Sequence, residues 1–499
     1  MATLTESVRV SHTPGARRKV LAAAMARTGA GSLVSGLLSI AATKIVASVL
    51  GPAGVALLAT LQQTRQTALV AATANGQAAL VQGISARGGI ERREYVRTAA
   101  LTFGAASAAV LALMCLAPAW AASLTGLGAG RATLIGWVAI QVALLSAYVF
   151  LSGLVNALGG LGRLAALQSI APAVTAAGMF PVVLAMAGGR EVLLPMLLAG
   201  AAGASVLCAG VVLRGYRHEL SSWFRGTGRW WSGASARAFF RVSASMLLGG
   251  LAGSAAVLFV RTRIIEAQGF STAGQFDAAW GISMNQVMLL LTSMQAYYLP
   301  SVARARTAAE RSAQISTVLN LAALIAAPLL VIATAMKPLL LGLFYSREFG
   351  EASAYLRWML IGDYLKVAGW ILSVPLLANA DMGMYLAAEL TGYLVFAGAT
   401  LVLVRWRPAA ESAAIGFLAM NAAHAIFCAV RAGSRYRYRP ERRTVSLWLA
   451  GLAAVCAAGW SHWEIRPFQG STEMFWSLGA LAAAGCAARG LTHLERKTS

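Results

Sequence analysis

The chain of 499 residues is 58% hydrophobic and only 12% charged, and its mean hydropathy is +0.67. This composition excludes a soluble globular protein and is typical of a protein that crosses a membrane many times. A net charge of +23 would indicate a nucleic-acid partner in a soluble protein. Here it predicts an excess of arginine in the cytoplasmic loops.

The apolar segments predict about fourteen membrane-spanning helices. Residues 1–19 are polar and basic at their end. The apolar run that follows is too long for a signal peptide, so we expect an uncleaved first span. We therefore predict an all-α polytopic membrane protein. The predicted spans are 20–49, 52–84, 96–122, 132–158, 163–188, 191–213, 240–263, 272–300, 313–337, 353–378, 382–404, 411–430, 444–461 and 474–490.

Positive charge predicts the orientation of the spans. With a cytoplasmic N-terminus, the cytoplasmic loops hold about three times as many lysines and arginines as the opposite loops. Both termini are then cytoplasmic. The loop 214–239 mixes Trp223, Trp230 and Trp231 with arginines. This mixture is typical either of a segment on the anionic membrane surface or of a solvated linker.

A polar stretch lies in the middle of the second predicted span. In residues 60–67 only Leu61 is apolar, and eight successive helical residues point in every direction, so no rotation hides them from one side. Arg65 lies about 20 Å into its span. An arginine at the centre of a membrane helix costs about 2.5–3.5 kcal/mol. The stretch therefore predicts a wet cavity or a position inside a helix bundle.

We interpret the cations of the first two spans as the lining of a pathway for an anionic molecule. Arg27 and Lys44 lie in the first span, and Gln62 and Gln66 flank Arg65 in the second. For Arg65 the alternative is a structural cation bound to carbonyl oxygens. Arg27 and Lys44 are near enough to the span ends to reach the lipid headgroups instead.

The two halves of the chain resemble each other at an offset of about 220 residues. The offset places Gln286 on Gln66 and Asn285 on Arg65, and we add Asn285 to the predicted pathway. Such a repeat predicts two bundles of six helices with a substrate site between them. The predicted parts are a cytoplasmic N-terminus (1–19), an N-lobe (20–213), a cytoplasmic linker (214–239), a C-lobe (240–430), a basic cytoplasmic loop (431–443) and a last segment with two spans (444–499).

The C-lobe supplies further candidates for the pathway. Arg261 and Arg263 end the seventh span and are as typical of interfacial anchors as of a pathway. Asp363 and Lys366 lie three residues apart near the middle of the tenth span, where they either pair with each other or act separately. We assign Asp363 to ion coupling, because a carrier needs a carboxylate that binds and releases a cation within the membrane, and we add Lys366 to the pathway.

Three segments carry a family resemblance. They are GQFDAAWGIS at 274–283 with YYLP at 297–300, LGPAGV at 50–55, and 344–366, which ends in LIGDYLK. They resemble the polysaccharide-transport branch of the multidrug/oligosaccharidyl-lipid/polysaccharide exporter superfamily, and more narrowly the Wzx-type flippases for O-antigen and enterobacterial common antigen. The resemblance covers about residues 20–430. The chain departs from it at Gly281 and Met284, where family members often carry a lysine and an acidic residue.

The resemblance implies two six-helix bundles that form a V around a central cationic cavity, followed here by two extra C-terminal helices. It implies that undecaprenyl-diphosphate-linked oligosaccharide units are moved from the cytoplasmic to the periplasmic leaflet of a bacterial inner membrane by alternating access. Guanidinium groups suit the diphosphate. The expected partners are this lipid-linked oligosaccharide, membrane lipids, a polysaccharide polymerase and a chain-length regulator.

Other functions fit the sequence less well. No nucleotide-binding loop is present, and the five cysteines have no metal spacing. We therefore expect no enzyme activity, cofactor, metal or nucleic-acid partner. A multidrug or cation antiporter of the same superfamily favours a carboxylate-rich cavity. The lipid II flippase branch also combines fourteen spans with a cationic cavity. A scaffold in an export complex would not need Arg65 in mid-membrane.

Overall fold

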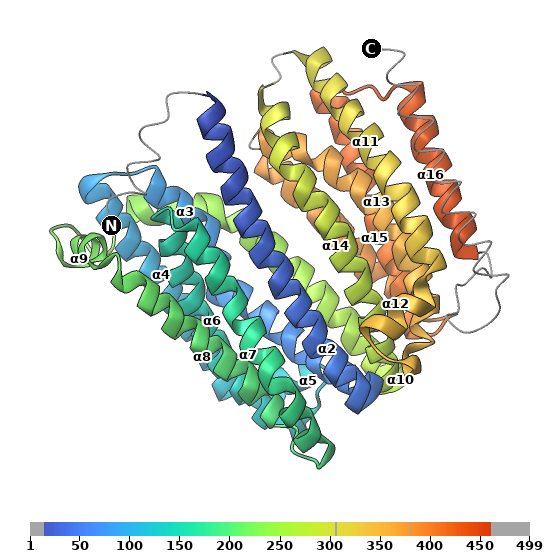
Figure 1. Ribbon diagram of the computed structural model, residues 1–499, viewed down its shortest axis with the longest axis horizontal. Helices are drawn as coiled ribbons and strands as arrows, with labels where there is room; N and C mark the ends of the chain where they lie inside the picture. The colour runs from blue at the N-terminus through green and yellow to red at the C-terminus, as the bar shows by residue number, and fades with distance from the viewer. Residues whose placement is uncertain (1–13, 305–306, 380, 461–499) are drawn as a thin grey trace. The chain divides into compact units, whose positions relative to one another are not determined.

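The computed structural model describes residues 14–304, 307–379 and 381–460, and every regular element in these ranges is a helix (Figure 1). This confirms the predicted all-α polytopic membrane protein. The elements are α2 (Pro14–Ala72), α3 (Gln77–Ser85), α4 (Gly89–Leu116), α5 (Pro118–Leu124), η1 (Ala129–Arg131), α6 (Ala132–Ala157), α7 (Leu161–Ala187), α8 (Leu193–Arg214), α9 (Arg217–Arg225), α10 (Gly233–Arg304), α11 (Ala308–Ala335), α12 (Lys337–Phe344), η2 (Arg347–Phe349), α13 (Ala352–Ala378), α14 (Met382–Leu403), α15 (Ala409–Tyr436) and α16 (Arg442–Trp460).

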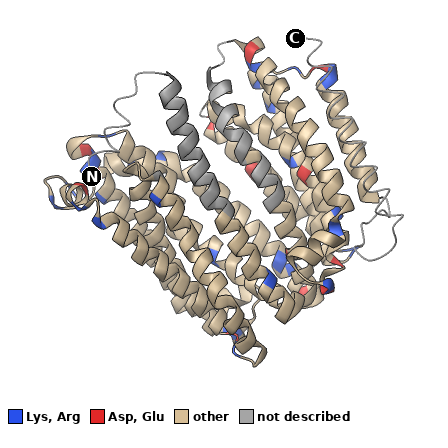
Figure 2. Ribbon diagram, in the orientation of Figure 1, with Lys and Arg blue, Asp and Glu red and all other residues tan. Residues whose placement is uncertain are grey.

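Eleven segments of the described chain are long and apolar enough to cross a membrane. Two of them, Val34–Ser85 and Gly233–Met284, are 52 residues long. At about 1.5 Å per residue each contains about 78 Å of helix, more than twice the roughly 30 Å of the hydrocarbon core, so each is long enough for two crossings. The helices follow the predicted spans up to 444–461, except that the span 52–84 is interrupted between α2 and α3 and the span 96–122 between α4 and α5. The last predicted span, 474–490, lies outside the described residues. Many of the charged residues lie at positions near helix ends (Figure 2).

A glycine breaks each of the two longest helices. Gly51 in α2 has φ 61° and ψ −158°, and Gly269 in α10 has φ 81° and ψ 177°. Backbone with positive φ is strained for any residue with a Cβ, so glycine is the residue that fits. Pro52 follows the first break and removes one backbone donor there. The two breaks are nearly equivalent under the offset of about 220 residues.

The chain forms two compact units. Unit 1 takes its residues from 1–49, 64–123 and 127–247, and unit 2 from 50–63, 124–126 and 248–499. In unit 1, α6 packs against α3, α4, α7 and α8. Its core contains Phe103, whose ring meets Phe150 and Phe239 at centroid distances of 5.5 and 6.2 Å.

The loop 214–239 is a packed part of unit 1. It contains α9 and the start of α10, which begins at Gly233 and thus earlier than the predicted span. Arg97 of α4 is 1% exposed, and its guanidinium donates to the carbonyls of Trp223, Gly226 and Gly228 at 2.9, 2.5 and 2.8 Å. Trp223 is buried in the core, whereas Trp230 is exposed. These hydrogen bonds therefore hold the loop against α4. Neither a segment on the membrane surface nor a solvated linker, the two interpretations from the sequence, included this contact.

In unit 2, α13 is the central helix. It packs against α11, α14, α15 and α16. In its most apolar stretch of 18 residues, 72% of the residues are buried, the highest share among the described spans. Beside it, Trp280 of α10 stacks on Phe396 and meets Phe417 edge-on, with centroid distances of 5.9 and 5.2 Å. Polar residues of α13 therefore face other helices rather than lipid.

Candidate functional site

The polar stretch of α2 presents side chains in all directions, as its sequence predicts. Thr60 and Thr64 are buried, while Gln62 and Gln66 are exposed. Arg65 is half-buried, and its Nε is enclosed without a hydrogen-bond partner among the described residues. An enclosed guanidinium nitrogen without a partner is costly. No hydrogen bond or ion pair joins Arg65 to the described residues, and its role as a substrate contact stays a prediction.

For three other residues of the predicted pathway the structure gives less information. Lys44 is half-buried in α2. Arg27 also belongs to α2 and Asn285 belongs to α10, but their side chains lie outside the part of the chain that the structure describes. The structure does not test whether these three residues line a substrate pathway, and this assignment stays a prediction.

Arg261 is held in a buried ion pair. Its Nη2 donates to Asp277 Oδ2 at 2.7 Å, and the two side chains are 5% and 7% exposed. Nη1 donates to the Ala59 carbonyl at 2.7 Å, and Nη2 also reaches the Ala56 carbonyl and the Thr60 hydroxyl, at 3.3 and 3.2 Å. The guanidinium thus joins α10 to the part of α2 that follows Gly51.

Arg263 lies two residues from Arg261 in a different environment. It forms a 3.0 Å ion pair with Glu266 on the surface, and the two side chains are 50% and 49% exposed. The two arginines are adjacent in the predicted pathway, yet one is enclosed in the protein and the other is not.

The three family-like segments meet at one place in unit 2. A Cβ on Gly274 would lie 1.8 Å from the Pro52 carbonyl oxygen, so only glycine permits this approach of α10 to α2. Gln275 Nε2 donates to the Glu348 carbonyl at 2.7 Å, and Gln275 Oε1 accepts from the Ala352 amide at 3.1 Å. The segments at 50–55, 274–283 and 344–366 thus share one packed contact.

Asp363 and Lys366 of α13 have different partners. Asp363 is fully buried, and its Oδ2 accepts from the Ser283 hydroxyl at 2.6 Å. Its Oδ1 is enclosed without a partner among the described residues. Lys366 Nζ donates to Met284 Sδ at 2.9 Å and lies 6.0 Å from the Phe417 ring centroid. Within the described residues no ion pair of 4 Å or less joins Asp363 and Lys366 in this structure.

A pair that the sequence analysis did not connect lies on α14 and α15. Glu389 Oε1 is 3.7 Å from His424 Nε2, with the side chains 26% and 15% exposed. His424 also lies 3.7 Å from Cys428 Sγ. The two residues belong to different apolar spans, and no spacing in the sequence joins them. In the described part of the chain, no group of three or more His, Cys, Asp or Glu could hold a metal ion.

No protein-family model and no curated protein matches the sequence, but solved structures of transporters match the fold. Lipid II flippase MurJ in an inward closed conformation aligns with a TM-score of 0.70 at 11% identity, over 93% of this chain and 99% of that chain. An inward-facing multidrug resistance MATE family transporter of the MOP superfamily aligns with a TM-score of 0.64 at 17% identity, over 86% and 96%. The crystal structure of MATE in complex with MaL6 aligns with a TM-score of 0.57 at 16% identity, over 88% of this chain and 97% of that chain. The chain therefore has the fold that MATE transporters and MurJ share.

Proposed function

We propose that the protein is a flippase. It moves undecaprenyl-diphosphate-linked oligosaccharide units from the cytoplasmic to the periplasmic leaflet of a bacterial inner membrane, for the assembly of a surface polysaccharide such as O-antigen, common antigen or exopolysaccharide. It works by alternating access, has both termini in the cytoplasm, and catalyses no covalent reaction.

Arg65 carries this proposal. It lies mid-span in α2, and its enclosed Nε has no partner among the described residues. Arg261 binds Asp277 through Nη2 although its own Nε is also enclosed without a partner, Arg263 binds Glu266 and Lys366 donates to Met284, whereas no hydrogen bond or ion pair joins Arg65 to the described residues. A diphosphate offers several charged oxygens to a planar guanidinium. A transported diphosphate would therefore satisfy a group that the described protein leaves unsatisfied.

The fold and the sequence motifs support the same substrate class. A lipid II flippase aligns with 93% of this chain, so the fold is compatible with a lipid-linked substrate. The segments at 50–55, 274–283 and 344–366 resemble the Wzx-type branch. The exposed Gln62 and Gln66 flank Arg65 and offer hydrogen bonds of the kind that sugar hydroxyls accept and donate.

Two relatives by fold suggest alternatives. A multidrug transporter shares the fold, but such an antiporter would favour a cavity rich in carboxylates, and the candidate pathway of this chain has a surplus of cations. A lipid II flippase shares the fold and the expected preference for a diphosphate. Transport of lipid-linked oligosaccharide and of lipid II by the purified protein, measured side by side, distinguishes the two flippase activities.

The test uses vesicles that contain the purified protein and a lipid-linked oligosaccharide whose outer-leaflet fraction is read with a membrane-impermeant glycosidase. Arg65→Ala should abolish transport with a normal amount of inserted protein. Arg65→Lys should retain part of it, because lysine keeps the charge but loses the two-pronged geometry. Arg263→Ala is the matched control, since that arginine already has an exposed partner. Full transport by Arg65→Ala would make Arg65 a structural residue and contradict the proposal.

Energy for this transport is proposed to come from an ion gradient, with Asp363 as the coupling carboxylate. The side chain is fully buried in α13, one oxygen is held by Ser283, and the other has no partner among the described residues. A carboxylate oxygen that is enclosed but unoccupied can accept a proton or a small cation.

A further inference from the structure

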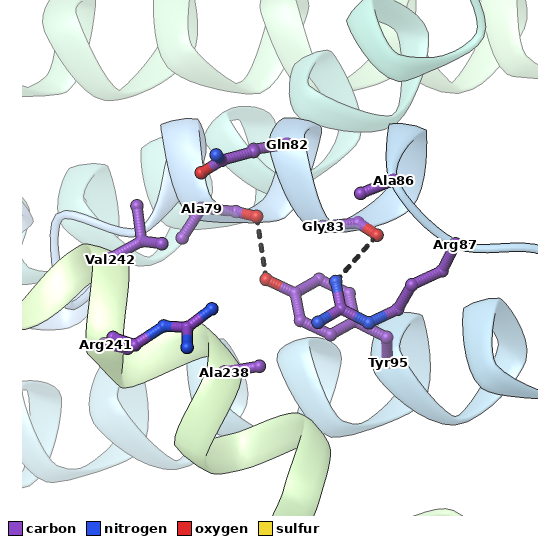
Figure 3. A pocket seen from close by; sticks show the side chains of 9 residues that line it. All are labelled: Ala79, Gln82, Gly83, Ala86, Arg87, Tyr95, Ala238, Arg241 and Val242. Carbon is purple, nitrogen blue, oxygen red and sulfur yellow. Dashed lines mark hydrogen bonds between the residues drawn. The ribbon is translucent and has the colours of Figure 1, made fainter. Parts of the chain in front are cut away.

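A small cavity in unit 1 is separate from the residues discussed so far. Its volume is about 110 Å³, and its walls come from α3, the start of α4 and the first turns of α10 (Figure 3). Two arginines, Arg87 and Arg241, line it together with Tyr95, Gln82 and small or apolar residues. None of the lining residues is acidic. The cavity thus brings two positive charges together without a carboxylate in its walls.

Arg87 is held in position by its neighbours. Its Nη1 donates to the Gly83 carbonyl at 3.0 Å, and its Cζ lies 4.3 Å from the Tyr95 ring centroid. The tyrosine hydroxyl donates to the Ala79 carbonyl at 2.7 Å. A Cβ on Gly83 would lie 2.0 Å from Tyr95 Cζ, so the ring needs a glycine there. The guanidinium is therefore pre-positioned, and most of its donors remain available.

Arg241 approaches the cavity from α10. Figure 3 shows its side chain extending from that helix toward Tyr95. The side chain is exposed and makes no hydrogen bond or ion pair with the residues that the structure describes. Two guanidinium groups near one cavity repel each other, and an anion bound between them would replace that repulsion with charge-assisted hydrogen bonds.

The cavity lies where membrane spans end. Arg87 sits between α3, which ends at Ser85, and α4, which begins at Gly89. Trp230 and Trp231, each 53% exposed, come directly before α10. Tryptophan is enriched at the level of the lipid headgroups, so the phosphate of a lipid is within reach of such a position.

We propose that this cavity binds a phosphate group. Guanidinium forks match the geometry of phosphate oxygens, and the Gln82 amide at the rim adds a further donor. The source is either the headgroup of an anionic membrane lipid or free inorganic phosphate. The site goes beyond the proposed transport and does not involve Arg65.

The experiment titrates the purified full-length protein and follows its tryptophan fluorescence. The probes are dihexanoyl phosphatidylglycerol, dihexanoyl phosphatidylcholine as the zwitterionic counterpart, and inorganic phosphate. Arg241→Gln and Arg87→Gln should each weaken binding of the anionic probe about tenfold. Arg237→Gln is the matched control, because Arg237 lies one turn earlier on α10, is exposed and does not line the cavity. It should bind like the unmodified protein.

The outcomes separate the two sources. Binding of phosphatidylglycerol without binding of inorganic phosphate assigns the site to a lipid headgroup, and saturation by inorganic phosphate alone assigns it to the free anion. The proposal is overturned if neither anionic probe binds, or if Arg237→Gln loses as much affinity as Arg241→Gln. Gel filtration of each variant shows whether it is folded, and Arg241→Gln changes an exposed side chain, so it should fold normally.

Discussion

Two buried acid–base sites of unit 2 differ in whether the carboxylate forms an ion pair with the nearby cation. At the first, Arg261 binds Asp277 and the carbonyls of Ala56 and Ala59. At the second, Asp363 is held through one oxygen by Ser283, and Lys366 donates to a sulfur atom rather than to the carboxylate. Both sites contain a carboxylate and a cation within membrane spans, but only the first forms an ion pair.

The difference indicates different uses. A buried ion pair with further hydrogen bonds holds two helices together and has little reason to open. A carboxylate with one unoccupied oxygen, close to a weakly engaged ammonium group, can change its partner at a smaller cost. We therefore propose a stabilising role for the first site and ion exchange for the second, and the following variants test this division.

Arg261→Ala should have the largest effect on stability. It leaves Asp277 buried without its cation, which costs about 3–5 kcal/mol. Thermal unfolding of the purified protein should show a much lower Tm. Replacing both partners, with Arg261→Met and Asp277→Leu together, should recover most of the loss, because no unpaired charge remains. A Tm for Arg261→Ala equal to that of the unmodified protein would contradict a structural role for the pair.

Gly274→Ala should have the next largest effect. The new Cβ would lie 1.8 Å from the Pro52 carbonyl oxygen, and because the obstacle is backbone the two helices must separate, at a cost of about 1–3 kcal/mol or more. Gly249→Ala serves as the control, since its Cβ would meet Leu386 Cδ1 at an ordinary 3.6 Å. The same thermal assay should separate the two variants, and equal Tm values would mean that the contact is not closely packed.

Asp363→Asn should change stability by less than about 1 kcal/mol, since the amide oxygen still accepts from Ser283. It should nevertheless abolish gradient-driven transport in vesicles while the lipid-linked oligosaccharide still binds. Glu389→Gln is the comparison variant, because Glu389 is also a carboxylate within a membrane span but has His424 rather than Ser283 as its neighbour. If gradient-driven transport survives Asp363→Asn and is lost in Glu389→Gln, the coupling carboxylate is Glu389.

Arg263→Ala should have the smallest effect. Its ion pair with Glu266 is about half exposed on both sides, and exposed pairs of this kind contribute less than about 1 kcal/mol. The Tm should stay close to that of the unmodified protein. A decrease in Tm as large as that of Arg261→Ala would contradict the view that burial determines how much each arginine contributes to stability.

The sequence by itself determined the helical spans. Hydrophobic runs of about 20 residues are required by the thickness of the membrane whatever their neighbours are. The sequence also showed that Arg65 would be costly to place in lipid, because the eight residues 60–67 point in all directions and cannot all be turned away from lipid by rotating the helix. Glycine permits the backbone conformation at the breaks of α2 and α10, at Gly51 and Gly269. Many other glycines lie inside helices without such a break, so the sequence alone did not locate the two breaks.

Only the tertiary structure decided which polar residues pair. Arg261 and Arg263 look alike in sequence, but a rotation of about 200° between them on the helix places one against Asp277 and the other at the surface. Glu389 and His424 meet only because α14 and α15 pack together. Arg87 and Arg241 share a cavity for the same reason, since it is built from three helices of unit 1. Side-chain pairing across helices depends on which faces pack, and a single sequence does not contain that information.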